Sequence, residues 1–319
     1  MGIKAPPKVK FNLIYKALNQ GNCLLNVSHL CQIANVSRTG YYAWLAAAPK
    51  RAEREEDDRR DFETVLEAFR YRYLKGARGI YMLLLHRNQR MNIKKIIRLM
   101  HKYDLKCPIR KHNPYRQMAK NLKTSNVAKN LLQRRFSEFG ARKVLLTDIT
   151  YLFYKGGKCY LSTVIDAFTH ELLDYKLSES LEVEFVLEMV DSMIDKHHAT
   201  LDNETIIHSD QGCHYTSYAF INKIKDINFI QSMSRRGNCW DNAPQESFYG
   251  HMKDEIKHEV YKLKTFKEVS MLIEDWMDYY NNERYQWDLL KLSPHEFYKY
   301  TVDGIYPLQI YKRARKEDK

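Results

Sequence analysis

The feature of this 319-residue chain that most constrains its fold is a change in hydrophobic pattern near residue 143. Before this point apolar residues recur at helical spacing, and after it they gather in short runs rich in β-formers. Gly156-Gly157 marks a hairpin turn within the second part. Three successive strands are predicted, at 144–152, 159–166 and 170–177. The C-terminal half must therefore build a sheet and cover it with helices.

The elements that follow complete a defined order. Helical spacing returns at 182–196, and a short buried strand is predicted at 205–208. A helix at 218–225 then precedes a strand at 229–233, and a last helix begins at about Asn242. Three strands, helix, strand, helix, strand and helix is the order of a ribonuclease-H-like domain. The predicted fold class is therefore α+β or α/β, with a mixed five-stranded sheet.

Charge divides the chain into two halves. Residues 1–140 hold 29 Lys and Arg against 10 Asp and Glu, whereas residues 141–319 hold 23 against 29. A basic half of this size is an electrostatic footprint for a polyanion, most simply nucleic acid. The acidic half needs another explanation, and carboxylates grouped around cations are one.

The basic half reads as small helical modules. Ser28 and Ser37 are predicted N-caps on either side of a tight turn at Asn35-Val36, which gives a helix-turn-helix shape. Residues 106–135 are rich in Lys, Arg, Asn and Gln, and we expect them to order only on DNA. The predicted divisions are a helix-turn-helix-like module at 1–50, a second helical DNA-binding module at 51–105, a basic linker at 106–140, a ribonuclease-H-like core at 141–260, and a helical C-terminal region with a basic tail at 261–319.

The sequence indicates neither a membrane protein nor a secreted one. No stretch approaches the roughly 18 apolar residues of a membrane span, and residues 1–10 lack the apolar core of a signal peptide. The six cysteines include no C-x-x-C pair, so we expect free thiols and no zinc site. The expected location is the cytoplasm.

Three carboxylates occupy positions that such a sheet can bring together. Asp148 lies within the first predicted strand, Asp210 directly follows the fourth, and Glu246 lies near the start of the last core helix, with 35 residues between it and Asp210. Hard divalent cations prefer oxygen ligands, and two such ions can hold both oxygens exchanged in a phosphodiester displacement. These residues are the candidate catalytic residues and the candidate ligands of two Mg²⁺ ions, for which Mn²⁺ could substitute.

The same residues lie in three blocks that carry a resemblance to a known family. The blocks are residues 147–151 (TDITY), 208–212 (HSDQG) and 237–248 (GNCWDNAPQESF), and a fourth is 280–284 (YNNER). Together they resemble the OrfB-type transposases of insertion sequence family three, whose core is similar to retroviral integrase. The interval of 35 residues before the glutamate is part of that family's pattern. Gln286 departs from it, because many relatives carry His there.

The resemblance implies a DNA transposase, a polynucleotidyl transferase that cleaves 3′-end strands and transfers them by a two-metal mechanism. It implies double-stranded DNA as partner, both the terminal inverted repeats of the element and the target. It also implies an assembly of at least two copies on paired ends, with the product of an upstream reading frame as a further candidate partner. A bacterial protein of this kind would work at the nucleoid, and no membrane is involved.

Basic residues near these blocks and in the helical modules are candidate DNA contacts. Lys253 lies seven residues after Glu246 and therefore on the same helix face, towards a DNA phosphate. Lys94, Lys95 and Arg98 are predicted on the outer face of their helix. The full set is Arg38, Lys94, Lys95, Arg98, Arg110, Lys111, Arg235, Arg236, Lys253 and Arg284.

Three further residues leave alternatives open. Asp241 is interpreted as the N-cap of the helix that carries Glu246 rather than as a fourth ligand. His208 could orient Asp210 or could be a packed strand-end histidine. Glu255 is a rival third carboxylate, but it lies on another side of the helix from Glu246.

Two other functions remain as alternatives to a transposase. A regulator that kept a transposase scaffold would bind DNA without cutting it, although such a protein has no need of three intact carboxylates. A ribonuclease-H-like nuclease without strand transfer would share the metals, but it would not need the strongly basic N-terminal half.

Overall fold

The computed structural model describes residues 5–19, 25–107, 127–133, 135–136, 138–235 and 239–308. The chain forms two compact units, residues 1–68 with 95–105 and residues 69–94 with 106–319. The helices of the first unit are α1 (Pro7–Asn19), α2 (Val27–Ile33), α3 (Arg38–Ala46), most of α4 (Ala48–Arg70) and most of α6 (Ile93–Lys102). Helix α5 (Ala77–His86) belongs to the second unit.

Helices α1 to α3 pack around a small aromatic core, in which Phe11 and Tyr41 meet edge to face. The predicted turn is confirmed, because Asn35 adopts a left-handed φ of 50° between α2 and α3. The prediction of Ser37 as N-cap is also confirmed, since its hydroxyl accepts from Gly40 N at 3.0 Å. The prediction of Ser28 as the N-cap of α2 is wrong. Asn26 is the N-cap and its side chain accepts from His29 N at 3.0 Å, so the helix begins two residues earlier than predicted.

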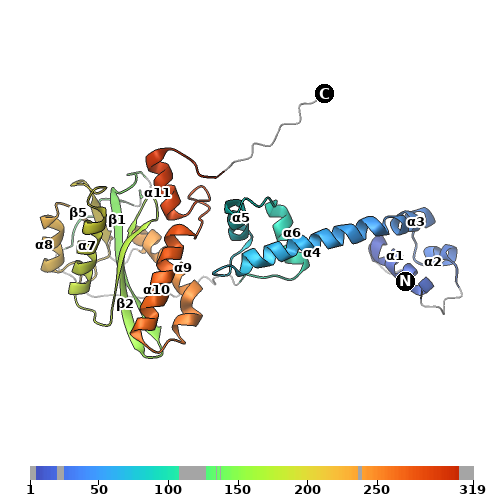
Figure 1. Ribbon diagram of the computed structural model, residues 1–319, viewed down its shortest axis with the longest axis horizontal. Helices are drawn as coiled ribbons and strands as arrows, with labels where there is room; N and C mark the ends of the chain where they lie inside the picture. Colours follow the sequence, from blue (N-terminus) through green and yellow to red (C-terminus); the bar gives the residue numbers. More distant parts are fainter. Residues whose placement is uncertain are drawn as a thin grey trace, which may run out of the picture. The chain divides into compact units, whose positions relative to one another are not determined.

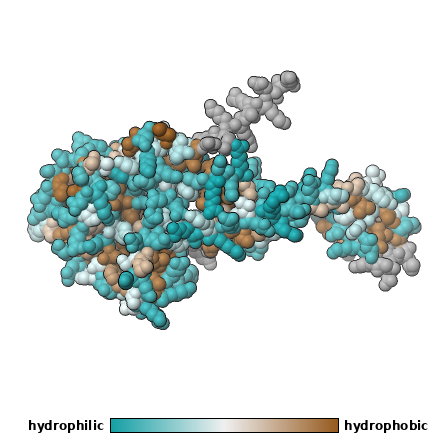
Figure 2. Space-filling view, in the orientation of Figure 1, coloured by the Kyte–Doolittle hydropathy of each residue, from teal (hydrophilic) through white to brown (hydrophobic). Residues whose placement is uncertain are grey.

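Helix α4 is a long polar helix, and Figure 2 shows its visible face as hydrophilic. Its carboxylates pair with the basic residues of α6. Asp58 accepts two hydrogen bonds of 2.6 Å from Arg98, and Asp61 pairs with Lys95. The side chains of Lys95 and Arg98 are 37% and 52% exposed, as expected of an outer face, but each is paired with an acid of α4. Their role as DNA contacts stays a prediction.

The core of the second unit is the predicted mixed sheet, in the order β3-β2-β1-β4-β5. The three N-terminal strands form an antiparallel meander, and β1 pairs in parallel with β4, as β4 does with β5. The strands are β1 (Val144–Tyr154), β2 (Gly157–Asp166), β3 (Leu172–Ser178), β4 (Ile206–Ser209) and β5 (Ile230–Met233). This element order and sheet define a ribonuclease-H-like fold, as predicted.

Helices cover both faces of this sheet (Figure 1). Helices α7 (Glu184–His197) and α8 (Tyr218–Asp226) bury Val186 and Phe220 against Leu145 of β1. The short turn η1 (Cys239–Asn242) leads into α9 (Ala243–Val260), which packs on the other face with α10 (Phe266–Asn282). Trp276 of α10 is fully buried there. Alternation along β1 therefore sends even-numbered residues to α9 and odd-numbered residues to α7.

Residues 127–133 pack against the sheet within the second unit. Leu132 is fully buried, Met233 N of β5 donates to Lys129 O at 3.4 Å, and Leu131 N donates to Ser232 Oγ at 3.0 Å. The expectation that all of residues 106–135 order only on DNA is wrong for this stretch, because the core itself provides its hydrogen bonds and its apolar contact. Residues 108–126 lie outside the described part of the chain.

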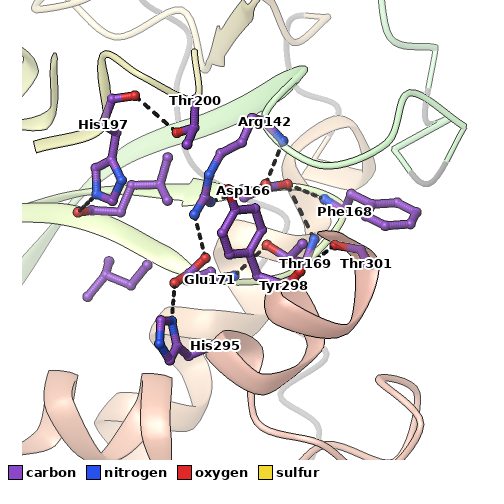
Figure 3. Close-up of polar contacts among 12 residues, drawn as sticks. Arg142, Asp166, Phe168, Thr169, Glu171, His197, Thr200, His295, Tyr298 and Thr301 are labelled. Atoms are coloured by element: carbon purple, nitrogen blue, oxygen red, sulfur yellow. Dashed lines mark hydrogen bonds and ion pairs between the residues drawn. The ribbon is translucent and has the colours of Figure 1, made fainter. Parts of the chain in front are cut away.

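Helix α11 (Pro294–Asp303) is fastened beside the start of β1 by a buried ionic cluster (Figure 3). Arg142 donates to Asp166 at 3.4 Å and to Glu171 at 2.6 Å, and its guanidinium lies 3.9 Å from the ring centre of Tyr298. His295 of α11 contacts the other oxygen of Glu171 at 2.8 Å. The cluster thus ties the first strand, the β2–β3 turn and the last helix together.

No helix within the described ranges is long and apolar enough to cross a membrane. The prediction of free thiols is confirmed for Cys31, Cys107, Cys159 and Cys213.

Candidate active site

Sheet register brings Asp148 and Asp210 to the same level. In the parallel pair of β1 and β4, Leu146 lies opposite His208. Asp148 comes two residues after Leu146, and Asp210 comes two residues after His208. Neighbouring strands lie about 4.8 Å apart. Both aspartates are partly exposed. The sheet therefore directs Asp148 and Asp210 to the same region, just past the last registered pair of β1 and β4.

Tyr215 reports the proximity of both aspartates. Its ring is buried against α8, and its hydroxyl lies 3.3 Å from Thr147 Oγ1. Burial is the largest cause that raises its pKa well above the ordinary value, and the negative charges of Asp148 and Asp210 add to it. Both carboxylates therefore act electrostatically on the buried Tyr215 hydroxyl, which stays protonated.

The turn after β4 orients Asp210. Gly212 N donates to Asp210 Oδ1 at 2.8 Å, and Gln211 Nε2 donates to Ser234 O at 3.0 Å. A Cβ atom at position 212 would lie 2.8 Å from the same carboxylate oxygen. A side chain at this position would therefore require the Asp210 carboxylate to move away.

Helix α9 docks at the level of Asp148 through two residues that flank Glu246. Tyr249 Oη accepts from Thr163 Oγ1 at 2.8 Å and donates to Asp148 O at 2.5 Å. Gln245 Nε2 donates to the same Thr163 hydroxyl. Thr163 is itself the β2 partner of Asp148 in the sheet. This directed chain of hydrogen bonds fixes the first turns of α9, and with them Glu246, to the strand of the first aspartate.

The three carboxylates lie in one region of the second unit, but their oxygens do not converge on a single position. Within the described residues, no group of three or more His, Cys, Asp or Glu side chains lies close enough to hold a metal ion. Glu246 is partly exposed, as the two aspartates are. Carboxylates repel one another, so protein atoms alone give no reason for them to converge. As donors, however, they are the hard, solvent-accessible oxygens that Mg²⁺ prefers.

Asp241 is not an N-cap, contrary to the sequence interpretation. Asn242 occupies that position without a side-chain hydrogen bond, and α9 begins at Ala243. Asp241 is buried in η1 instead, where its carboxylate binds Arg235. The reason is that the short turn η1 runs through Asn242, so that Asp241 lies within the turn and Asn242 is the residue before α9. Arg235, a predicted DNA contact, therefore already has an acidic partner.

His208 is a packed histidine rather than a partner of Asp210. Its Nδ1 lies 2.9 Å from Ser232 Oγ, and its Nε2 lies 3.0 Å from Asp241 O and 3.1 Å from Ser234 Oγ. Burial lowers its pKa to about 4, against a smaller upward effect of the bond to Asp241. Because the carbonyl can only accept, Nε2 carries the proton and the ring is neutral at pH 7.

The 280–284 block fastens α10 to the core. Asn281 donates to Leu172 O at 2.8 Å and accepts from Leu172 N at 2.9 Å. Arg284 donates to Glu255 at 3.0 Å, and its side chain is only 16% exposed. Glu255 also accepts from Trp276, so this rival carboxylate has a structural role. Gln286 lies 3.1 Å from His170 Nδ1, which is a packing contact as well.

The remaining predicted DNA contacts are spread over both units. Arg38 is exposed at the first residue of α3, Lys94 is exposed in α6, and Lys253 is partly exposed on α9. The predictions for Arg110, Lys111 and Arg236 fall outside the described residues.

Sequence reasoning missed Tyr215, Gln245 and Tyr249. Only the spacing of the last two, four residues apart on α9, could have indicated that they share the face beside Glu246.

Family comparisons agree with this geometry. Residues 140–239 match a family model described as an integrase core domain, and residues 229–294 match a second one of the same description. Residues 55–113 match an HTH-like domain, so that match covers the second helical module and not the helical pair at 1–50.

Two curated relatives match most of this chain. The putative transposase InsK for insertion sequence element IS150 of Escherichia coli (strain K12) is 32% identical over 289 residues, which cover 88% of this chain and 96% of the relative. Transposase InsF for insertion sequence IS3A, from the same organism, is 25% identical over 292 residues, 89% of this chain and 97% of the relative. Among solved structures, the catalytic core domain of BIV integrase gives a TM-score of 0.40 at 14% identity, over 51% of this chain and 97% of that one.

The chain is thus a ribonuclease-H-like protein with an integrase core. It belongs to the insertion-sequence transposases of family three, the family that its sequence blocks predicted.

Proposed function

We propose that Asp148, Asp210 and Glu246 are the catalytic residues with which this transposase cleaves the 3′-end strands of its element and joins them to target DNA. The observation that carries the proposal is where the three residues lie: each aspartate comes two residues after the last registered pair of β1 and β4, and Gln245 and Tyr249 dock the helix of Glu246 beside Asp148.

The donor chemistry of this site suits two Mg²⁺ ions, which the three carboxylates would hold, with Mn²⁺ as a substitute. When bound, such ions supply Lewis-acid activation of water and stabilise charge on the phosphodiester oxygens. Gly212 orients Asp210 for this task, and Ile149 N holds Asp148 Oδ1 at 2.8 Å. Lys253, seven residues beyond Glu246 on α9, would bind a DNA phosphate and help hold the strand in place.

The partners we propose are the terminal inverted repeats of the element, the target DNA and at least one further copy of this chain. The product of an upstream reading frame is a further candidate. The site of action we propose is the bacterial cytoplasm, at the nucleoid.

A strand-transfer assay tests the proposal. The purified full chain is mixed with labelled element-end DNA and a target plasmid, in Mg²⁺ or in EDTA, beside Glu246→Gln. Joined products should require both the metal and Glu246, with a loss of about 10³-fold or more in the variant, because a ligand to the reacting centre is removed. Glu259→Gln is the matched control, since Glu259 is an exposed acid on the same helix; this variant should join DNA as the wild type does.

Other outcomes would identify the alternatives. Cleavage without joining would indicate a nuclease. Binding without either reaction, even after addition of the upstream-frame product, would indicate a regulator. Full activity of Glu246→Gln would remove Glu246 from the proposed site.

A further inference from the structure

Asp241 lies between the last strand of the sheet and the helix that carries Glu246, and its side chain is 0% exposed. Its Oδ2 accepts from Arg235 N at 3.0 Å, from Arg235 Nε at 2.9 Å and from Asn130 Nδ2 at 2.8 Å. Its Oδ1 accepts from Arg235 Nη2 at 2.9 Å. A buried charge with this many charge-assisted bonds cannot shift without losing several at once.

The main chain of the same residue is tied to the strand that precedes Asp210. Asp241 O accepts from Nε2 of His208, which lies two residues before Asp210. The ring also contacts Ser232 and Ser234, on and just after β5. One point therefore connects the strand of the second aspartate to the start of α9.

Residues 130–133, which precede the sheet in the chain, are also bonded to Asp241, through Asn130. Asn130 uses its amide to bind Asp241 and its Oδ1 to accept from Leu132 N at 3.1 Å and from Gln133 N at 3.0 Å. The neighbouring Leu131 N binds Ser232 Oγ, which in turn contacts His208. Burial of Leu132 in the core fixes the segment from the other side.

We propose that Asp241 is a positioning residue that, through Arg235, His208 and Asn130, sets the start of α9 and thereby the position of Glu246 relative to Asp210. The proposal rests on the proposed function for its consequence but not for its geometry. It assigns Arg235 and Asn130 to the alignment of the carboxylates. Loss of Asp241 leaves Arg235 and Asn130 without their common acceptor and lets the first turn of α9 move.

The test combines hydrogen exchange with strand joining on the full chain. Asp241→Asn should speed amide exchange over residues 243–249 by roughly tenfold, because local opening no longer breaks the charged bonds. It should lower the rate of strand joining by a similar factor at saturating DNA, with DNA affinity unchanged. Asn130→Ala removes one of the bonds to Asp241, together with the bonds from Leu132 N and Gln133 N, and should give a smaller effect of the same kind. If Asp241→Asn fails to fold, Asn130→Ala and Arg235→Gln carry the test.

Glu138→Gln is the matched control, because Glu138 lies near the same entry segment in an exposed pair with Arg135 and outside this network. It should change neither measurement. Unchanged exchange over 243–249 in the Asp241 and Asn130 variants would overturn the proposal. So would faster exchange with an unchanged joining rate. Absence of joining by the wild type would instead refute the proposed function, and the exchange data would still decide whether Asp241 fixes the helix.

Discussion

His208 is neutral at pH 7 because it is fully buried, and this gives the protein a defined loss of stability in acid. The folded pKa is about 4, below the ordinary value of 6.5. Between these values the unfolded chain binds a proton that the folded chain does not. The stability that the folded protein gains from a neutral, buried His208 is therefore complete above pH 6.5 and is lost as the pH falls towards 4. The loss amounts to about 3 kcal/mol at most.

Urea unfolding at pH 7 and at pH 4.5 measures this contribution. His208→Gln keeps a donor for Asp241 O but cannot titrate, so we expect it to be less stable than the wild type at pH 7 and to lose less stability on acidification. His258→Gln, an exposed histidine on α9, should keep the wild-type dependence on pH. Part of the loss should persist in every variant, because burial also lowers the pKa of His197. Equal losses in wild type and His208→Gln would contradict the assignment.

At the scale of residues, the sequence singled out Asp148, Asp210 and Glu246 as candidates but misread their neighbours. The three acids were chosen as a set, from their joint spacing and from the blocks that resemble the family. The role of Asp241 was not available in this way, because its partner Asn130 is 111 residues distant along the chain. The same holds for Arg284, whose pairing with Glu255 joins the segment after α10 to α9. Long-range ion pairs carry no local pattern.

At the scale of elements, the hydrophobic period predicted where strands and helices lie along the chain, but it did not predict which polar helix faces meet. The predicted strands and helices of the core are present, with ends that differ by a few residues. The ion pairs between α6 and α4 were not predicted, because two helices that are each amphipathic do not reveal which polar faces meet. The N-cap at Asn26 was missed for a local reason, since both Asn26 and Ser28 are good caps.

The ionic cluster around Arg142 acts at the scale of elements, because it joins the start of β1, the β2–β3 turn and α11, beside the ring contact of Phe168 with Phe297. We expect Arg142→Met to lower the free energy of unfolding by about 3–5 kcal/mol, since it leaves Asp166 and Glu171 buried without their cation. Urea unfolding measures the loss, and hydrogen exchange should show α11 loosened first. Lys143→Ala, which removes the neighbouring exposed pairs with Asp202 and Glu204, should leave stability unchanged. A stable Arg142→Met protein with a protected α11 would rule out this role.

At the scale of the whole molecule, the proposed function assigns DNA binding mainly to the basic half of the chain and chemistry to the acidic half. The basic half holds 29 Lys and Arg against 10 acids, whereas the carboxylates of the candidate site lie in the acidic half. Phosphate contacts release counterions, so they make affinity depend on salt. A carboxylate at the reacting centre contributes nothing of this kind. The two kinds of residue should therefore respond differently to substitution and to ionic strength.

Asp148→Asn should abolish strand cleavage and leave both the affinity for element-end DNA and its salt dependence close to those of the wild type. Arg38→Ala, at the exposed start of α3, should weaken binding and reduce the slope of log affinity against log salt by about one, because one phosphate contact is lost. Fluorescence anisotropy across a salt series, read beside a cleavage assay, separates the two effects. Loss of DNA binding by a folded Asp148→Asn protein would contradict this division, because it would place the first aspartate in recognition as well as in chemistry.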